Sequence, residues 1–180
     1  MTAEPSPRQL LEQAEIVYTA AEVDAAVQRM AGEISRSVGD SAPLVLCVMS
    51  GAAVFAGQLL PQLAFPLEFD YVQATRYRNR TRGEDIVWIV EPGENVRGRT
   101  ILLLDDILDE GHTLEAVRKK CLQAGAERVL IAVLTEKDTG QPKPVGADFV
   151  GLHVPDRYVF GCGMYVYGWW RNLGGIYALK

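Results

Sequence analysis

The sequence has few cysteines and no pattern that groups them. Cys47, Cys121 and Cys162 are the only three in 180 residues, and no two of them form a CxxC pair. An odd number of widely spaced cysteines predicts neither a disulfide framework nor a zinc site. We expect three buried, reduced thiols, which favours a cytoplasmic protein.

Long apolar runs and an excess of positive charge are also missing. No segment approaches the roughly 18 uninterrupted apolar residues of a membrane span, and the amino terminus lacks the pattern of a signal peptide. Lys and Arg number 18 against 23 Asp and Glu, a net charge of -5. This sign disfavours broad binding to a phosphate backbone. We therefore expect neither a membrane nor a nucleic acid as partner.

Tandem repeats, low-complexity tracts and linker-like stretches are absent as well. The composition, 48% apolar and 23% charged, is typical of a folded globular protein. The length suits one domain, so the sequence predicts a single domain over residues 1–180.

Strand and helix patterns alternate along the chain. Thr19 and Glu22 have capping-box spacing, and apolar residues follow at helical spacing, which predicts a helix over 20–38. Short apolar runs and further periodic segments predict strands at 44–49, 67–75, 86–90, 100–104 and 128–134 and helices at 52–63 and 112–124. This order indicates an α/β fold with a twisted, mostly parallel β-sheet flanked by helices, in which ligands bind beyond the carboxyl ends of the strands.

Three carboxylates follow the apolar run at 100–104. Asp105, Asp106 and Asp109 come first, and Gly111 and Thr113 then mark the start of a helix. Carboxylates at the end of a buried strand are costly unless they face a ligand, a metal or water. Backbone N–H groups at a helix start can hold a phosphate. The combination suits a sugar phosphate, and the alternative is that the acids only cap and solvate a loop.

The segment ILLLDDILDEGHT, residues 101–113, resembles the phosphoribosyl-pyrophosphate (PRPP) signature of the type I phosphoribosyltransferases. Segments at 44–60, 134–138 and 148–173 are similar in order and spacing to the hypoxanthine-guanine phosphoribosyltransferases. The resemblance covers roughly residues 15–180. It implies the type I phosphoribosyltransferase fold, with a small hood subdomain formed by the N-terminal and C-terminal segments.

The resemblance implies that hypoxanthine or guanine displaces pyrophosphate from PRPP to give IMP or GMP. It places the ribose hydroxyls on Asp105 and Asp106 and the 5′-phosphate on the loop of Asp109, Glu110, Gly111, His112 and Thr113. It places the pyrophosphate near Ser50, Gly51 and Arg171. Magnesium is implied, held mainly by substrate oxygens and waters, with Asp105 and Asp106 as its protein contacts.

Asp109 and Tyr77 are the implied catalytic residues. A carboxylate at Asp109 can exchange the proton of purine N7 and stabilise an oxocarbenium-like transition state. Tyr77 belongs to a polar segment with four arginines, 76–85, for which we expect an exposed loop. The segment matches a loop of the family that closes over PRPP and excludes water. The arginines could also attract an anionic substrate.

Four residues are implied to bind the purine. Lys137 would donate to the oxygen at C6, which selects hypoxanthine and guanine over adenine. Tyr158 would stack on the ring, the backbone of Val159 would contact its edge, and Tyr165 would lie near position 2. The alternatives are a surface lysine in a loop and a buried core tyrosine.

Four positions depart from the usual family pattern. Glu110 replaces a common threonine, Ser50 a lysine of the pyrophosphate loop, Arg76 the serine of the closing loop, and Tyr165 an aspartate. A carboxylate at Glu110 would have to point away from the 5′-phosphate. The change at Tyr165 suggests hypoxanthine as a better substrate than guanine.

Two other functions are compatible with the same residues. One is a xanthine-preferring phosphoribosyltransferase, and another is a regulator that senses PRPP or a nucleotide on the same fold. Asp109, Lys137, Tyr77 and Arg171 favour catalysis, since a sensor needs neither a base nor a closing loop. The resemblance also implies a homodimer or homotetramer, with the pair Trp169 and Trp170 at an interface or in the core.

Overall fold

The structure, a computed structural model, describes residues 6–77 and 85–180 and is built around a six-stranded sheet. The strand order is β4-β3-β2-β5-β6-β7, and every neighbouring pair is parallel except the antiparallel β3 and β4. The strands are β2 (Leu44–Met49), β3 (Glu68–Tyr77), β4 (Asp85–Val90), β5 (Thr100–Leu108), β6 (Arg128–Asp138) and β7 (Phe149–Pro155). The predicted mostly parallel sheet is therefore confirmed.

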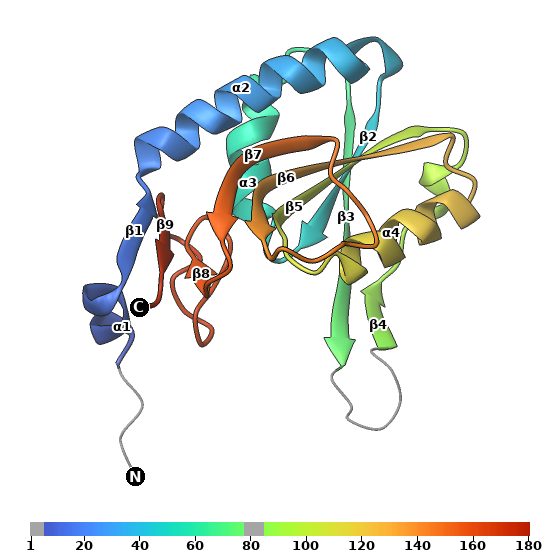
Figure 1. Cartoon of the computed structure of the whole chain (residues 1–180). Coiled ribbons are helices and arrows are strands. Elements are labelled where there is room, and N and C mark those ends of the chain that lie inside the picture. The colour runs from blue at the N-terminus through green and yellow to red at the C-terminus, as the bar shows by residue number, and fades with distance from the viewer. Residues whose placement is uncertain (1–5, 78–84) are drawn as a thin grey trace.

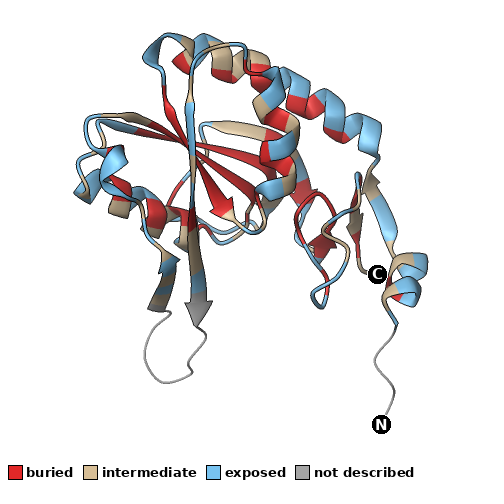
Figure 2. Ribbon diagram, turned by 180° about the vertical axis from the view of Figure 1, so that it is seen from behind, coloured by how far each residue is buried: buried red, intermediate tan, exposed pale blue. Residues whose placement is uncertain are grey.

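Helices cover both faces of this sheet (Figure 1). Helices α2 (Ala20–Val38) and α3 (Ala53–Leu59) pack on one face, and α4 (His112–Gln123) packs on the other. Because side chains alternate along a strand, Leu102 and Leu104 of β5 join the first core while Ile101 and Leu103 join the second. The central strands are accordingly buried along most of their length (Figure 2).

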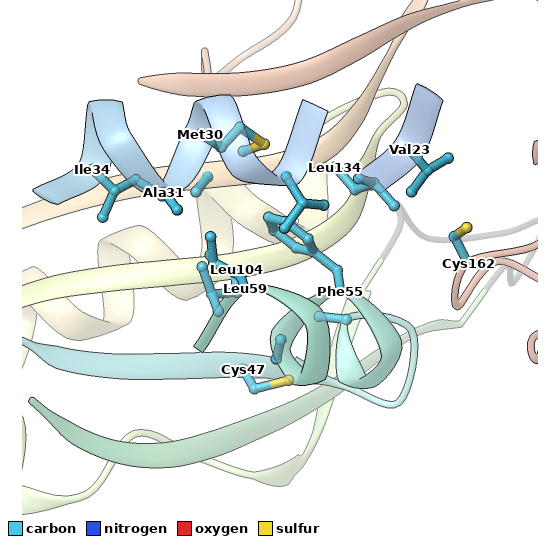
Figure 3. Packing of buried hydrophobic residues seen from close by; sticks show 14 of the residues in the cluster. Val23, Met30, Ala31, Ile34, Cys47, Phe55, Leu59, Leu104, Leu134 and Cys162 are labelled. Atoms are coloured by element: carbon cyan, nitrogen blue, oxygen red, sulfur yellow. The ribbon is translucent and has the colours of Figure 1, made fainter. Parts of the chain in front are cut away.

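The core on the α2 side is large and apolar. Met30 and Ile34 of α2 meet Phe55 of α3 and the strand residues Leu104 and Leu134 (Figure 3). The helix begins where its sequence predicts, because the Thr19 hydroxyl accepts a hydrogen bond from Glu22 N at 3.3 Å and Thr19 N donates to Glu22 Oε2 at 2.8 Å. The prediction over 20–38 is confirmed.

A second, smaller sheet joins the two ends of the chain. Strands β1 (Glu15–Tyr18) and β8 (Val159–Phe160) both pair antiparallel with β9 (Ile176–Ala178), and helix α1 (Pro7–Gln13) lies beside them (Figure 1). Leu10 of α1 packs with Phe160 and Val166. These strands have two to four residues, too short for a periodic pattern. The remaining elements are short 3-10 helices, η1 (Gly39–Ser41), η2 (Leu60–Gln62) and η3 (Glu94–Val96).

Several element ends differ from the sequence prediction. The predicted bounds of the loop at 76–85 are wrong, because β3 continues to Tyr77 and β4 begins at Asp85. The rest of the predicted loop, 78–84, lies outside the described residues. Strands β5 and β6 run four residues further than predicted. Strand β5 pairs with β6 up to Leu108 opposite Glu136, and β6 pairs with β7 up to Asp138 opposite Pro155. Helix α3 ends at Leu59, and Pro61, which has no N–H to donate, follows in η2.

All three cysteines are buried and free, as expected. Within residues 6–77 and 85–180, no helix combines the length and the apolar character that crossing a bilayer requires.

Candidate active site

Two adjoining cavities open at the carboxyl ends of the central strands. The first, which we call the acidic cavity, has a volume of about 470 Å³ and is lined by the ends of β2 and β5, by β3 residues and by the start of α4. The second, the aromatic cavity, has a volume of about 480 Å³ and adds residues of β6 and β8. Both are lined by Asp106, Ile107, Asp109, Tyr165 and Arg171. The two cavities are therefore neighbouring parts of one site.

The structure brings almost all the sequence-predicted site residues to these cavities. The acidic cavity is lined by Ser50, Gly51, Asp105, Asp106, Asp109, Glu110, Gly111, His112, Thr113 and Arg171. The aromatic cavity is lined by Lys137, Tyr158, Val159 and Tyr165. The side chain of Tyr77 lies outside what the structure describes, so its predicted role stays a prediction.

Two buried carboxylates line the acidic cavity. Asp105 and Asp106 lie within β5, where the sequence suggested the strand had ended, and Asp106 N donates to Asp105 Oδ1 at 3.0 Å. Burial, together with the negative charge of Asp106, raises the pKa of Asp105 well above its usual value. Burial also raises the pKa of Asp106, although its hydrogen bond with Asp105 and the positive charge of Arg171 oppose that rise. Such carboxylates are suited to accept hydrogen bonds from a hydroxylated ligand or to meet a cation.

Glycines allow the backbone to close around Asp106. A Cβ at Gly51 would overlap the Asp106 carboxylate, and one at Gly163, whose φ is 102°, would overlap the Gly51 carbonyl oxygen. The preceding Met49–Ser50 peptide bond is cis. A larger side chain at either glycine would push the β2 loop away from the carboxylate.

The turn from β5 into α4 presents backbone N–H groups to the acidic cavity. Gly111 precedes the helix with a φ of 86°, which favours glycine, and no side chain caps the helix among the described residues. Because the first N–H groups of a helix have no partner within it, the start of α4 is suited to an anion such as a phosphate.

An ion pair stands where the two cavities meet. Lys137 Nζ lies 2.7 Å from Asp109 Oδ2, and the Asp109 side chain is 45% exposed while that of Lys137 is 12% exposed. Asp109 follows the end of β5, and Lys137 lies in the extension of β6 rather than in a loop. A heterocycle that enters here meets a carboxylate and an ammonium group side by side.

Aromatic side chains and one arginine complete the aromatic cavity. The guanidinium of Arg171 lies 4.3 Å from the ring centre of Tyr165 and donates to the Gly163 carbonyl oxygen. Tyr158 is 52% exposed, so it is not the buried core tyrosine that the sequence left open. Partial burial and the neighbouring Tyr165 and Tyr167 raise its pKa. Its ring remains available to stack on a flat ligand.

Some residues that hold the site in place could not be recognised from the sequence. Thr135 is fully buried, and its hydroxyl donates to the backbone oxygen of Asp106 at 2.9 Å. A threonine between an apolar run and three charged residues offered only a weak indication of this contact. Gly163 and Lys143 lie in segments for which the sequence predicted no element, and no sequence pattern pointed to their contacts.

The carboxylates of the acidic cavity are suited to a magnesium ion that is held mainly by its substrate. No cluster of three or more His, Cys, Asp or Glu side chains suited to a metal ion occurs among residues 6–77 and 85–180. Asp105 and Asp106 nevertheless supply two adjacent carboxylates, the number that Mg²⁺ uses when substrate oxygens and waters complete its shell.

Comparison with known proteins relates the chain to one group. Residues 13–168 match the family described as phosphoribosyl transferase domain. The chain is 31% identical over 166 residues to the hypoxanthine-guanine phosphoribosyltransferase of Bacillus subtilis, with 92% of each chain covered. It is 28% identical over 166 residues to the hypoxanthine-guanine-xanthine phosphoribosyltransferase of Tritrichomonas foetus, covering 92% of this chain and 91% of the relative.

Solved structures give the same result. A hypoxanthine-guanine-xanthine phosphoribosyltransferase matches with a TM-score of 0.78 at 27% identity, covering 94% of this chain and 96% of the other. A hypoxanthine phosphoribosyltransferase from Staphylococcus aureus matches with a TM-score of 0.85 at 19% identity, a likeness of fold that covers 98% and 97%.

Proposed function

The chain belongs to the phosphoribosyltransferase family and has its type I fold, and from this premise we propose that it is a purine-salvage enzyme. It transfers the phosphoribosyl group of PRPP to hypoxanthine or guanine and gives IMP or GMP with release of pyrophosphate. The observation that carries the proposal is the Asp109–Lys137 pair between a cavity suited to a sugar phosphate and a cavity suited to a flat aromatic ring.

PRPP occupies the acidic cavity in this proposal. The 5′-phosphate binds the backbone from Asp109 to Thr113 at the start of α4, and Asp105 and Asp106 accept hydrogen bonds from the ribose hydroxyls. The pyrophosphate extends toward Ser50, Gly51 and Arg171. Magnesium, when bound, offsets the charge of the pyrophosphate, with Asp105 and Asp106 as its protein contacts. Glu110 lines the same cavity, where its carboxylate has to face away from the phosphate.

The purine occupies the aromatic cavity. Tyr158 stacks on the ring, and the backbone of Val159 contacts its edge. The ammonium of Lys137 donates to the oxygen at C6, which a 6-oxopurine has and adenine lacks. Tyr165, held over Arg171, lies where the 2-position of the purine is expected.

The reaction exchanges one bond for another at C1 of the ribose. The bond to the pyrophosphate oxygen breaks, a bond to purine N9 forms, and the proton on N7 passes to a carboxylate oxygen of Asp109. That carboxylate also stabilises the positive charge that develops on the ribose in the transition state. Lys137, 2.7 Å from Asp109 before the purine arrives, then divides its hydrogen bonds between the carboxylate and the purine oxygen. Tyr77 closes over PRPP and excludes water.

Further proposals concern the organisation of the chain. We assign the small sheet of β1, β9 and β8 as the hood of a single domain.

We also propose that the protein acts in the cytoplasm, where its free cysteines stay reduced, and that it assembles as a homodimer or homotetramer. Trp169 is 56% exposed and suits an interface, whereas Trp170 packs inward with its Nε1 donating to the Pro7 oxygen at 2.6 Å.

A spectrophotometric assay tests the proposed function. The purified protein is given PRPP and magnesium with hypoxanthine, guanine, xanthine, adenine or uracil, and pyrophosphate release is measured in parallel. We expect turnover with hypoxanthine and guanine and none with adenine or uracil. A preference for xanthine, one of the three bases in the name of the Tritrichomonas foetus relative, would identify a xanthine-preferring enzyme instead. Binding of PRPP without turnover on any base would instead identify a PRPP-sensing regulator.

A further inference from the structure

Lys143 ties together the ends of the two strands that carry the Asp109–Lys137 pair. Its ammonium donates to the backbone oxygen of Leu108 at 3.2 Å and to the backbone oxygen of Lys137 at 2.7 Å. It also lies 3.1 Å from Glu136 Oε1. Leu108 ends β5 and directly precedes Asp109, whereas Glu136 and Lys137 belong to the last residues of β6.

These contacts satisfy all three hydrogen-bond donors of the Lys143 ammonium. A lysine has three N–H donors, and here each has an acceptor. The side chain is only 11% exposed, a burial that lysine tolerates when its charge is paired. Lys143 therefore has no donor left for a substrate, and its effect on the reaction must pass through the strand ends that it holds.

The chain around Lys143 is held in place for this contact. Pro142 and Pro144 flank it, and a residue before proline is restricted to extended conformations. Pro144 and Val145 in turn lie close to Gly111, the residue before α4. A Cβ added at Gly111 would come within 3.4 Å of a side-chain atom of each. The start of α4 thus also has apolar neighbours, which make no use of the Lys143 ammonium.

We propose that Lys143 is a positioning residue for the Asp109–Lys137 pair. By fixing the end of β5 relative to the end of β6, it sets the separation at which the carboxylate and the ammonium meet the purine. The inference rests on the proposed transfer to a 6-oxopurine. It assigns to Lys143 a selective effect on the purine step, with little effect on PRPP binding.

The variant Lys143→Met tests the proposal, because methionine retains the unbranched shape and removes the donors. We expect kcat/KM for hypoxanthine to fall about tenfold to a hundredfold, with a raised KM for hypoxanthine. The KM for PRPP should stay within about twofold of the wild-type value. Lys119→Met is the matched control, since Lys119 is 65% exposed and pairs with Glu115 on the outside of α4.

A second variant separates positioning from a simple loss of charge balance. Lys143→Met leaves Glu136 without its lysine, and the double variant Lys143→Met/Glu136→Gln removes that unpaired carboxylate. We expect the double variant to keep the raised KM for hypoxanthine. Recovery of wild-type kinetics, or a loss of kcat with both KM values unchanged, would overturn the proposal.

Hydrogen–deuterium exchange gives a readout that does not depend on activity. Peptides over 105–111 and 134–140 should exchange faster in Lys143→Met than in Lys119→Met, and equal exchange would overturn the proposal. A wild-type protein inactive with every purine would contradict the proposed function. The exchange comparison would then still decide whether Lys143 holds the two strand ends.

Discussion

The acidic and aromatic cavities differ in how their side chains are held. Asp105 and Asp106 are buried in a central strand with neighbours on both sides, so their positions follow from the core. Tyr158 and Tyr165 are 52% and 45% exposed and come from the C-terminal part of the chain, outside the central sheet. The acid pair of the acidic cavity is thus part of the stable framework, while the two tyrosines of the aromatic cavity can change with little cost to folding. Substitutions in the two halves should therefore separate effects on stability from effects on substrate choice.

The largest expected effect is at the junction of the two cavities. Asp109→Ala removes the proposed base and should lower kcat about 100-fold to 10,000-fold, while PRPP binding stays nearly unchanged. Steady-state kinetics and calorimetric titration with PRPP check the two parts. Asp40→Ala, an exposed residue in η1, is the control. Unchanged turnover in Asp109→Ala would remove Asp109 from the mechanism.

The next effect belongs to the aromatic cavity alone. Lys137→Ala removes the proposed donor to the purine oxygen and should raise the KM for hypoxanthine about tenfold to a hundredfold. The KM for PRPP should change far less, since its proposed binding groups lie in the acidic cavity. An equal rise in both KM values would show that the two halves do not act separately.

A smaller effect, on both stability and catalysis, is expected beneath the acidic cavity. Thr135→Val keeps the shape and removes the hydroxyl that donates to the Asp106 carbonyl oxygen. The free energy of unfolding should fall by about 1–3 kcal/mol, measured by urea denaturation. The KM for PRPP should rise as well, because Asp106 loses support. A loss of stability without any change in that KM would mean that Thr135 serves the fold alone.

The smallest effect is expected at the start of α2, whose capping residues line neither cavity. Hydrogen bonds with Thr19 lower the pKa of Glu22, so its carboxylate stabilises the fold above the unfolded-state pKa and loses this effect as the pH falls through the folded-state pKa. Glu22→Gln should therefore lower the melting temperature slightly at pH 7. The difference from wild type should vanish in acid below both pKa values. A difference that persists there would assign the effect to something other than charge.

The central strands show what the sequence could predict. The capping box of Thr19 and Glu22 and the helical spacing of the apolar residues predict helix α2 from local sequence alone. The short apolar runs at 44–49 and 100–104 likewise indicate buried strands. The ends of β5 and β6 could not be found in this way. Asp105, Asp106 and Lys137 are poor strand formers, and pairing with neighbouring strands places them in the ladder.

The candidate site shows the same division between local and long-range information. The acids and the glycine turn at 105–113 are contiguous, so the sequence alone indicated a sugar-phosphate site. The contacts of Thr135 with Asp106 and of Lys143 with Leu108 join residues 29 and 35 positions apart, and no local pattern reveals them. Residues that hold a site in place are thus harder to predict than those that line it.

Product analysis by mass spectrometry tests most directly whether the two cavities serve one reaction. The wild-type protein is incubated with PRPP, magnesium and hypoxanthine, and IMP and pyrophosphate are quantified together. We expect both products in equal amounts, and at least about 100-fold less of each from Asp109→Ala on the same time scale. PRPP that binds but is never converted to IMP would contradict the assignment of the Asp109–Lys137 pair as the centre of phosphoribosyl transfer.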